Sequence, residues 1–159
     1  DVIFRISNND VAFKYKIYPQ GETLSCVVKQ EATGFVFPDG TTTFLCPQSK
    51  PMGGFARTSP SYETSYTADD VAGKNGWGEG YTFPCLFRNG DNGWVLVSET
   101  GVNGGYCASR LLGHKGGTYT IGFPQEGEAN GNGTVSPGIA ITRARRLGVL
   151  LLWARLWLQ

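Results

Sequence analysis

Short runs in which apolar and polar residues alternate, separated by turn residues, recur along the chain. In residues 11–18 every second residue is a large apolar one, beginning with Val11 and Phe13. A period of two predicts a strand with one buried and one exposed face. Asn and Asp in residues 8–10 separate this run from a second strand-like run at residues 2–6, so the two predict a hairpin. Glycine supplies 23 of the 159 residues, a composition that suits an all-β domain with many turns.

The strongest local signal is a second hairpin. Residues 81–87 and 94–98 are rich in strand-forming residues and flank residues 88–93, which contain two Asn-Gly pairs. Asn and Gly tolerate the positive φ that tight hairpin turns need. Further strands are predicted at residues 23–29, 34–37, 41–46 and 118–123.

The remaining segments predict loops and very little helix. Residues 47–80 read as a long loop with a short strand around residues 62–66. Outside the C-terminal tail, a short turn at residues 109–112 is the best helix candidate. His114 lies in Gly-His-Lys-Gly-Gly and is predicted at a loop tip. A Ser-His-Asp or Cys-His triad could use only this histidine, and its predicted place at a loop tip argues against that role, so no catalytic residue is predicted.

The four cysteines, Cys26, Cys46, Cys85 and Cys107, are spaced too widely for a zinc knuckle or ribbon. The first three lie among apolar residues in strand-like runs, which favours thiols buried in the core. Two disulfides are the alternative for an exported protein, and the sequence leaves all three pairings open.

The net charge of +1 argues against a strongly basic nucleic-acid binder, but it hides a division of the chain. Residues 1–141 hold ten basic and thirteen acidic residues and so carry a net charge of −3. Residues 142–159 hold four arginines and no acidic residue. No apolar stretch reaches the length of a membrane-spanning helix, and no signal peptide is found at the N-terminus. The chain begins inside a strand-like run, so we expect a fragment.

Several segments, in this order, carry a resemblance to a known family. They are Asp-Val-Ala-Phe-Lys-Tyr at residues 10–15, Ser-Tyr-Glu-Thr-Ser-Tyr at 61–66, Trp-Val-Leu-Val-Ser-Glu-Thr-Gly-Val at 94–102, Tyr-Cys-Ala-Ser-Arg-Leu at 106–111 and Gly-Asn-Gly-Thr-Val-Ser-Pro-Gly-Ile-Ala at 131–140. Together they resemble the N-terminal β-sandwich domain of glycoside hydrolase family 97, which comprises bacterial α-glucosidases and α-galactosidases.

The resemblance implies an all-β fold, a partial antiparallel sandwich of the galactose-mutarotase-like type. Enzymes of that family join this domain to a (β/α)₈ barrel that carries the catalytic carboxylates, and to a small C-terminal β domain. Residues 1–141 would then be a partial N-terminal domain, truncated at both ends and inactive alone. Its partners would be the missing barrel and a carbohydrate. The parent enzyme would be periplasmic, secreted or held at the cell surface.

One residue matches a functional position of the family. A glutamate of the N-terminal domain is a ligand of a calcium ion beside the catalytic carboxylates, and Glu99 stands at that position. Calcium takes six to eight oxygen ligands, so Glu99 would need glutamates of the barrel as well. The simpler interpretation is a glutamate at a strand end that pairs with a cation such as Arg110.

Aromatic residues in or beside loops suggest an alternative function. Tyr62, Tyr66, Trp77, Tyr81 and Tyr106 could stack on sugar rings in a free-standing carbohydrate-binding sandwich without catalysis. Packing in the core or at a domain interface is the favoured interpretation for each of them. No sugar-binding residue is therefore assigned.

The last 18 residues, 142–159, differ from the rest of the chain. Their Ala, Leu and Arg content favours a helix, and a basic helix lying on a membrane is one interpretation. A frameshift is the other. Written in permitted codons and read from the third nucleotide of residue 141, this segment encodes Pro-Trp-Arg-Val-Ile-Thr-Val-Gly. That run resembles what the family carries after its Ser-Pro-x-Ile-Ala segment, and we expect a one-nucleotide shift near residue 141 and then a premature stop.

The frameshift is tested by the nucleotide sequence of the gene from residue 141 onward. We expect codons that restore the Val-Ile-Thr-Val run when one nucleotide is inserted or removed, followed by a region that encodes a barrel. Codons that encode the Arg, Leu and Trp run but give no family-like sequence in the shifted frame would contradict the prediction.

Overall fold

The computed structural model describes residues 1–18, 21–22, 25–47, 66–73, 80–100, 109–115, 117–123, 139–142 and 150–157. Within these residues the chain forms strands and no helix, as the all-β prediction requires. None of them forms a helix suited to crossing a membrane. The strands are β1 (Val2–Ile6), β2 (Asp10–Tyr15), β3 (Ser25–Val28), β4 (Gly34–Val36), β5 (Thr42–Pro47), β6 (Asp70–Val71), β7 (Tyr81–Arg88), β8 (Trp94–Thr100), β9 (Arg110–Lys115), β10 (Thr118–Gly122), β11 (Ile139–Thr142) and β12 (Leu150–Trp157).

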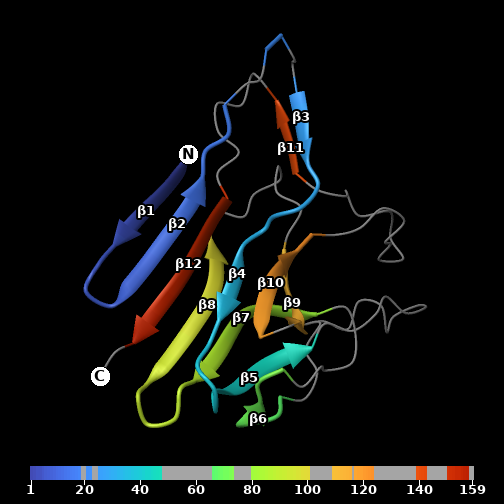
Figure 1. Cartoon of the computed structure of the whole chain (residues 1–159). Coiled ribbons are helices and arrows are strands. Elements are labelled where there is room, and N and C mark those ends of the chain that lie inside the picture. Colours follow the sequence, from blue (N-terminus) through green and yellow to red (C-terminus); the bar gives the residue numbers. More distant parts are fainter. Residues whose placement is uncertain are drawn as a thin grey trace, which may run out of the picture.

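Ten of these strands form one sheet, in which eight follow the order β1-β2-β12-β8-β7-β9-β10-β4 and β5 and β6 continue from β7 (Figure 1). Strands β3 and β11 pair separately. The pairings are antiparallel throughout the described residues, as expected for strands joined by hairpins.

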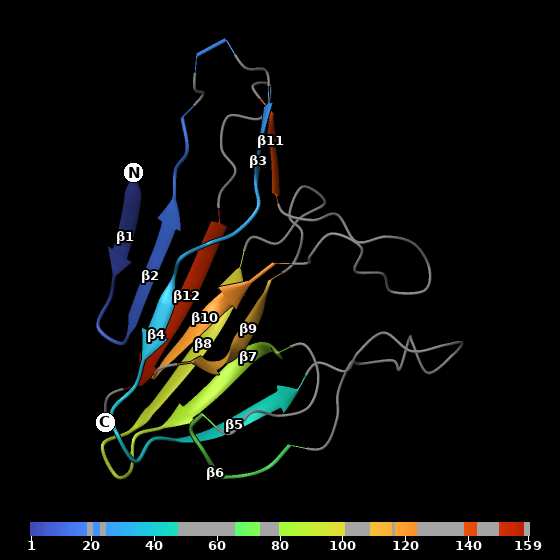
Figure 2. The ribbon, with the colours of Figure 1, turned by 45° about the vertical axis from the view of Figure 1, so that its right-hand side comes forward.

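The large sheet folds over at the junction of β7 and β9, where Tyr81 pairs with Leu111. Gly80 precedes this junction with a φ of +115°, and a Cβ at Gly80 would lie 2.6 Å from the Leu111 carbonyl oxygen. Only glycine allows both this φ and this approach of two backbones. The junction brings β4 and β10 over β7 and β8, so one continuous sheet supplies both layers of a sandwich (Figure 2).

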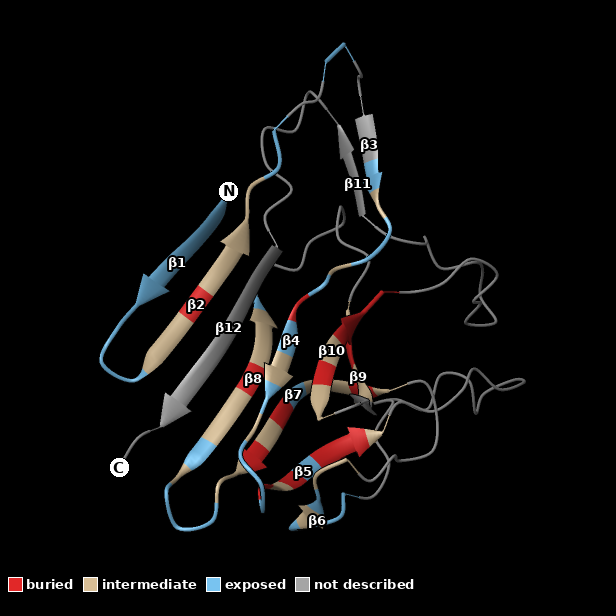
Figure 3. Ribbon diagram, viewed as in Figure 1, coloured by how far each residue is buried: buried red, intermediate tan, exposed pale blue. Residues whose placement is uncertain are grey.

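The core lies between these two layers. Phe87 of β7 is fully buried, stacks on Phe37 at 4.0 Å between ring centroids and meets Tyr119 of β10 edge-on at 5.2 Å. Residues from five strands complete the cluster: Leu45, Tyr81, Cys85, Val97, Leu111 and Ile121, joined by Phe123. Buried residues accordingly concentrate on β5, β7, β9 and β10, whereas β1 is exposed along its whole length (Figure 3).

Two cysteines confirm the prediction of buried core thiols. Cys46 and Cys85 are both buried and neither forms a disulfide. Burial raises the pKa of the Cys85 thiol, so this thiol stays protonated and unreactive. Cys107 and the side chain of Cys26 lie outside the described residues.

Both predicted hairpins are confirmed. Val2 to Ile6 pair with Tyr15 to Val11, and Cys85 to Arg88 pair with Val97 to Trp94. Between the latter, Gly90 and Gly93 adopt positive φ, and the Asn89 N–H donates to the Gly93 carbonyl at 2.9 Å. This turn depends on residues that are close in the sequence, so the sequence pattern was sufficient to predict the hairpin.

Two local predictions near residue 110 are wrong. Residues 109–112 do not form a helical turn, because β9 begins at Arg110. His114 is not at a loop tip, because its backbone belongs to β9 and the positive φ of the turn falls on Gly117. Pairing of β9 with β10 and with Tyr81 determines this strand, and these contacts lie outside the short window on which the local prediction rests.

The predicted preference of the tail for helix is also wrong for its last part. Leu150 to Trp157 form β12, which pairs with β2 on one side and β8 on the other. Helix propensities differ by less than about 1 kcal/mol per residue, so hydrogen bonding to two open strand edges outweighs them. As a result β12 joins the β1–β2 hairpin to the rest of the sheet (Figure 1).

The Asp69 side chain links β5 and β7 by hydrogen bonds at one end of the sandwich. It precedes β6 with a φ of +48°, and its carboxylate accepts hydrogen bonds from Thr42 at 2.7 Å and from Arg88 at 3.2 Å. Arg88 in turn lies over the Trp94 ring at 5.7 Å. Hydrogen bonds, first from Thr42 and then from Arg88, hold the pKa of the Asp69 carboxyl below its ordinary value of 3.8.

This shift predicts a pH-dependent contribution to stability. Because the folded pKa is lower than the unfolded one, ionised Asp69 stabilises the fold above pH 3.8, and this stabilisation is lost as the pH falls through the folded pKa. Asp69→Asn keeps a residue that tolerates positive φ but removes the charge. We expect it to lower the free energy of unfolding at pH 7, and we expect the difference from wild type to shrink below pH 3.8.

Chemical denaturation at a series of pH values measures this difference. Asp39→Asn is the matched control, because Asp39 is an exposed aspartate in the turn before β5, and its free energy of unfolding should stay at the wild-type value at pH 7. A loss in Asp69→Asn that is the same at every pH would show that the charge has no part in it.

Candidate functional site

Glu99 is placed at the rim of the core by the alternation of β8. Val95, Val97 and Glu99 share one face of this strand, and Val97 is fully buried between the layers. Glu99 comes last on this face, one residue before the strand ends, and is half-buried. The pairing of Glu99 with Leu152, and of Leu152 with Phe13, extends the same row across the sheet.

The Glu99 carboxylate is held by a hydroxyl from the other layer. Ser109, directly before β9, donates a hydrogen bond from Oγ to Glu99 Oε2 at 2.7 Å. Hydrogen bonds to an ionised carboxylate are stronger than neutral ones. The end of β8 and the start of β9 are therefore linked at this point by a side-chain contact.

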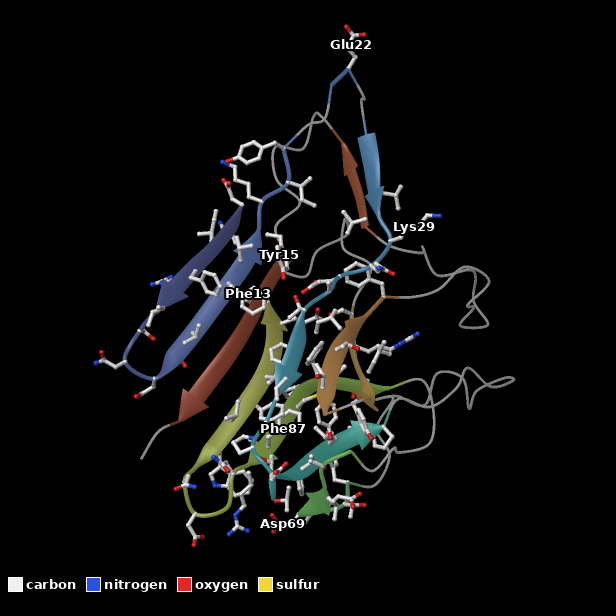
Figure 4. The ribbon with its side chains drawn as sticks, in the orientation of Figure 1. Phe13, Tyr15, Glu22, Lys29, Asp69 and Phe87 are labelled. Carbon is white, nitrogen blue, oxygen red and sulfur yellow. The ribbon has the colours of Figure 1, made fainter. Side chains whose placement is uncertain are left out.

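A second carboxylate approaches from the segment before β4. Thr33 donates to Glu31 Oε1, and the Tyr15 hydroxyl lies 2.8 Å from Thr33 Oγ1. Since the Thr33 hydroxyl has one proton and gives it to Glu31, Tyr15 is the donor to Thr33. In Figure 4, Phe13 and Tyr15 project from β2 toward β4, so this relay crosses from the β2 side of the sandwich to the β4 side.

The two glutamates interact electrostatically. Burial raises the pKa of the Glu31 carboxyl above its ordinary value of 4.5; the hydrogen bond from Thr33 opposes this, and the negative charge of Glu99 adds to it. Glu31 Oε2 is buried and accepts no hydrogen bond from any described residue. The site formed by Glu31, Thr33, Glu99 and Ser109, with Tyr15 behind them, is thus an acidic site with hydroxyl donors, and we refer to it as the Glu99 site.

The chemistry of this site fits a hard cation in part. Carboxylate oxygens are the ligands that calcium prefers, and Glu31 Oε2 is a buried oxygen for which the described residues supply no donor. No three His, Cys, Asp or Glu residues among the described ones come together as a metal site. Two carboxylates fall short of six to eight ligands, so the described residues could supply only one side of a calcium site.

The alternatives raised by the sequence meet different outcomes. Tyr81 is 5% exposed and belongs to the core, so it is no sugar platform. Tyr66 is exposed but stacks on Phe44, with 5.0 Å between ring centroids. Tyr62, Trp77 and Tyr106 lie outside the described residues. The hydrogen bond shown for Glu99 comes from Ser109, and its pairing with Arg110 stays a prediction.

The sequence did not reveal Glu31 and Ser109 as members of this site. Glu31 lies 68 residues before Glu99, and Ser109 precedes a strand that was expected to be a helical turn. Only Ser109 carried a signal of position, because it stands directly before β9, whose first two residues, Arg110 and Leu111, are buried. Only the folding over of the sheet brings Glu31 and Ser109 to Glu99.

An all-β sandwich with an acidic site at its rim defines a class of domain, and comparison with known proteins identifies the family. The family model described as "Glycosyl-hydrolase 97 N-terminal" matches residues 1–146. The chain therefore belongs to the N-terminal domain family of the glycoside hydrolase 97 enzymes, and the resemblance seen in the sequence is confirmed.

Solved structures agree with this assignment. The crystal structure of a beta-arabinopyranosidase is similar over 98% of the chain, with 51% sequence identity and a TM-score of 0.83. A glycoside hydrolase family 97 enzyme in complex with acarbose, from Pseudoalteromonas sp. strain K8, is similar over 97% of the chain, with 17% identity and a TM-score of 0.65. A variant of that enzyme in complex with panose has 16% identity, the same 97% coverage and a TM-score of 0.67. At such low identity the last two show the fold alone.

The chain is short compared with these structures. It spans 24% of the beta-arabinopyranosidase and 20% of the family 97 enzymes. Curated proteins include no significant match. The chain is thus an N-terminal domain of the kind that these larger enzymes contain.

Proposed function

We propose that this domain serves a larger glycoside hydrolase by packing on its catalytic domain and supplying Glu99 to a calcium site shared between the two. Membership of the family and the share of its relatives that the chain spans support the first part. The observation that carries the second is the hydrogen bond that fixes the Glu99 carboxylate next to Glu31 at the rim of the core. The domain alone is then inactive.

The domain's own residues have distinct parts in this function. Glu99 offers carboxylate oxygen, Ser109 holds Oε2 of that carboxylate, and the core beneath Val97 keeps the strand end in place. A calcium ion bound there supplies positive charge that stabilises negative charge developing on the substrate or on the groups around it. The neighbouring negative charges of Glu31 and Glu99 make the rim attractive to such a cation.

For the substrate we propose a glycoside of an arabinopyranose or of a sugar with related stereochemistry. Support comes from the 51% identity to a beta-arabinopyranosidase, which is far higher than the 17% identity to an acarbose-bound family 97 enzyme. An arabinopyranose lacks the C6 hydroxymethyl group of a hexopyranose. A pocket closed around the position of the missing C6 group rejects a hexopyranose sterically. The family alone led to the expectation of α-glucosides and α-galactosides.

Glu99→Gln tests the calcium role in a full-length enzyme that contains this domain. Replacing the charged ligand by an amide should weaken calcium binding by at least about 100-fold, beyond what is typical for residues that act behind the ligands. The calcium concentration that gives half-maximal hydrolysis of a nitrophenyl glycoside measures this change.

Glu22→Gln is the matched control, because Glu22 is an exposed glutamate far from the site (Figure 4). It should leave the calcium dependence at the wild-type value. A Glu99→Gln enzyme with a wild-type calcium dependence would exclude Glu99 as a ligand, and hydrolysis by the isolated chain would exclude the division of labour between the two domains.

The substrate proposal has its own measurement. We expect the full-length enzyme to hydrolyse nitrophenyl arabinopyranosides with a kcat/KM at least about tenfold above that for the α-glucoside and α-galactoside, since one extra carbon group in a fitted pocket costs about that factor. The highest kcat/KM on the α-glucoside would contradict the proposal.

For the tail we propose that residues 142–159 are read out of frame. In the shifted frame, the nucleotides of residues 149–153 encode the Val-Ile-Thr-Val run. Strand β12 begins at nearly the same place, at Leu150. A run with high strand propensity thus falls where the sheet has a strand between β2 and β8. This agreement of position supports the frameshift, and the nucleotide sequence remains its test.

A further inference from the structure

The hydroxyl of Ser109 stands in an unusual relation to Glu99. The two residues are ten positions apart in the sequence but belong to different layers of the sandwich, and Ser109 Oγ lies 2.7 Å from Glu99 Oε2. The contact is half-buried on both sides.

Both ends of this hydrogen bond are anchored by the fold. On one side, Glu99 follows the buried Val97 and pairs with Leu152. On the other, Ser109 is followed by Arg110, which is 7% exposed, and by Leu111, which is fully buried and pairs with Tyr81 and Ile121. The Ser109 hydroxyl is therefore placed beside Glu99 by a residue that directly adjoins the buried start of β9.

The nearby Glu31 carboxylate makes the orientation of the Glu99 carboxylate important. Glu31 Oε2 is buried and accepts no hydrogen bond from any described residue, so this carboxylate also needs a partner at the site. The Ser109 donor fixes the direction of the second oxygen of the Glu99 carboxylate, which is what a cation with strict distance requirements needs.

We propose that Ser109 is the positioning residue of the calcium site: it does not bind the ion but holds Glu99 in the orientation that binds it. This inference rests on the proposed role of Glu99. Partners behind a metal ligand fix its orientation, and their loss typically weakens metal affinity by about 10- to 100-fold. Ser109→Ala should weaken calcium binding within that range.

The experiment measures calcium affinity by isothermal titration calorimetry in a full-length enzyme that contains this domain, together with the calcium-induced rise in melting temperature. Ser109→Thr retains a hydroxyl and should bind calcium with an affinity close to wild type. Ser109→Val has the shape of threonine without the hydroxyl and should match Ser109→Ala. The comparison of Ser109→Thr with Ser109→Val keeps the test decisive even where Ser109→Ala lowers the stability of the calcium-free protein.

Ser7→Ala is the matched control. Ser7 donates its hydroxyl to the Asp10 carboxylate at 3.3 Å on the exposed β1–β2 turn, so the same kind of contact is removed elsewhere. Calcium affinity should not change in this variant.

The outcomes separate this inference from the proposed function. Wild-type affinity in Glu99→Gln would overturn both. A large loss in Glu99→Gln, together with equal affinities in Ser109→Thr and Ser109→Val, would leave Glu99 as a ligand and overturn the role of Ser109. A loss in Ser109→Val that is restored in Ser109→Thr would establish positioning by the hydroxyl.

Discussion

The stacking of Phe37 on Phe87, with Tyr119 packed edge-on, is the contact on which the rest of the sandwich depends. The backbone joins the two layers only weakly, because the register of β7 and β9 records a single pair, Tyr81 with Leu111. Side-chain packing must therefore hold the layers at their distance. Fully buried aromatic side chains such as Phe87 and Tyr119 contribute several kcal/mol each when their loss leaves a cavity.

The same packing determines the geometry at the rim. Glu99 belongs to the layer that contains Phe87, and Ser109 leads into the layer that contains Tyr119. A shift of one layer against the other by about an ångström would break a hydrogen bond of 2.7 Å. The orientation of the Glu99 carboxylate is therefore only as well defined as the packing between the two layers.

How much of the fold and of the site could be predicted depends on how far apart in the sequence the interacting residues lie. The Asn-Gly turn between β7 and β8 was predictable because Asn89 and Gly93 lie close in the sequence. Residues 109–112 and the last part of the tail were assigned to helix wrongly, since β9 owes its conformation to pairing with β10 and Tyr81, and β12 owes its conformation to pairing with β2 and β8. For the site, Glu99 was found through the family resemblance, whereas Glu31 and Ser109 became visible only when the sheet folded over.

The proposed calcium site follows from a limit on what one layer of strands can offer. Val97, the residue before Glu99 on the same face of β8, is apolar and fully buried, so β8 offers the ion no second ligand on that face. Glu99 therefore needs ligands from other elements, and within the described residues no group of three His, Cys, Asp or Glu side chains comes together. A calcium ion at this rim must draw most of its ligands from outside the described residues, so its affinity would report contact with a second domain. Calcium binding and docking of the catalytic domain would then be coupled, each strengthening the other by the same factor.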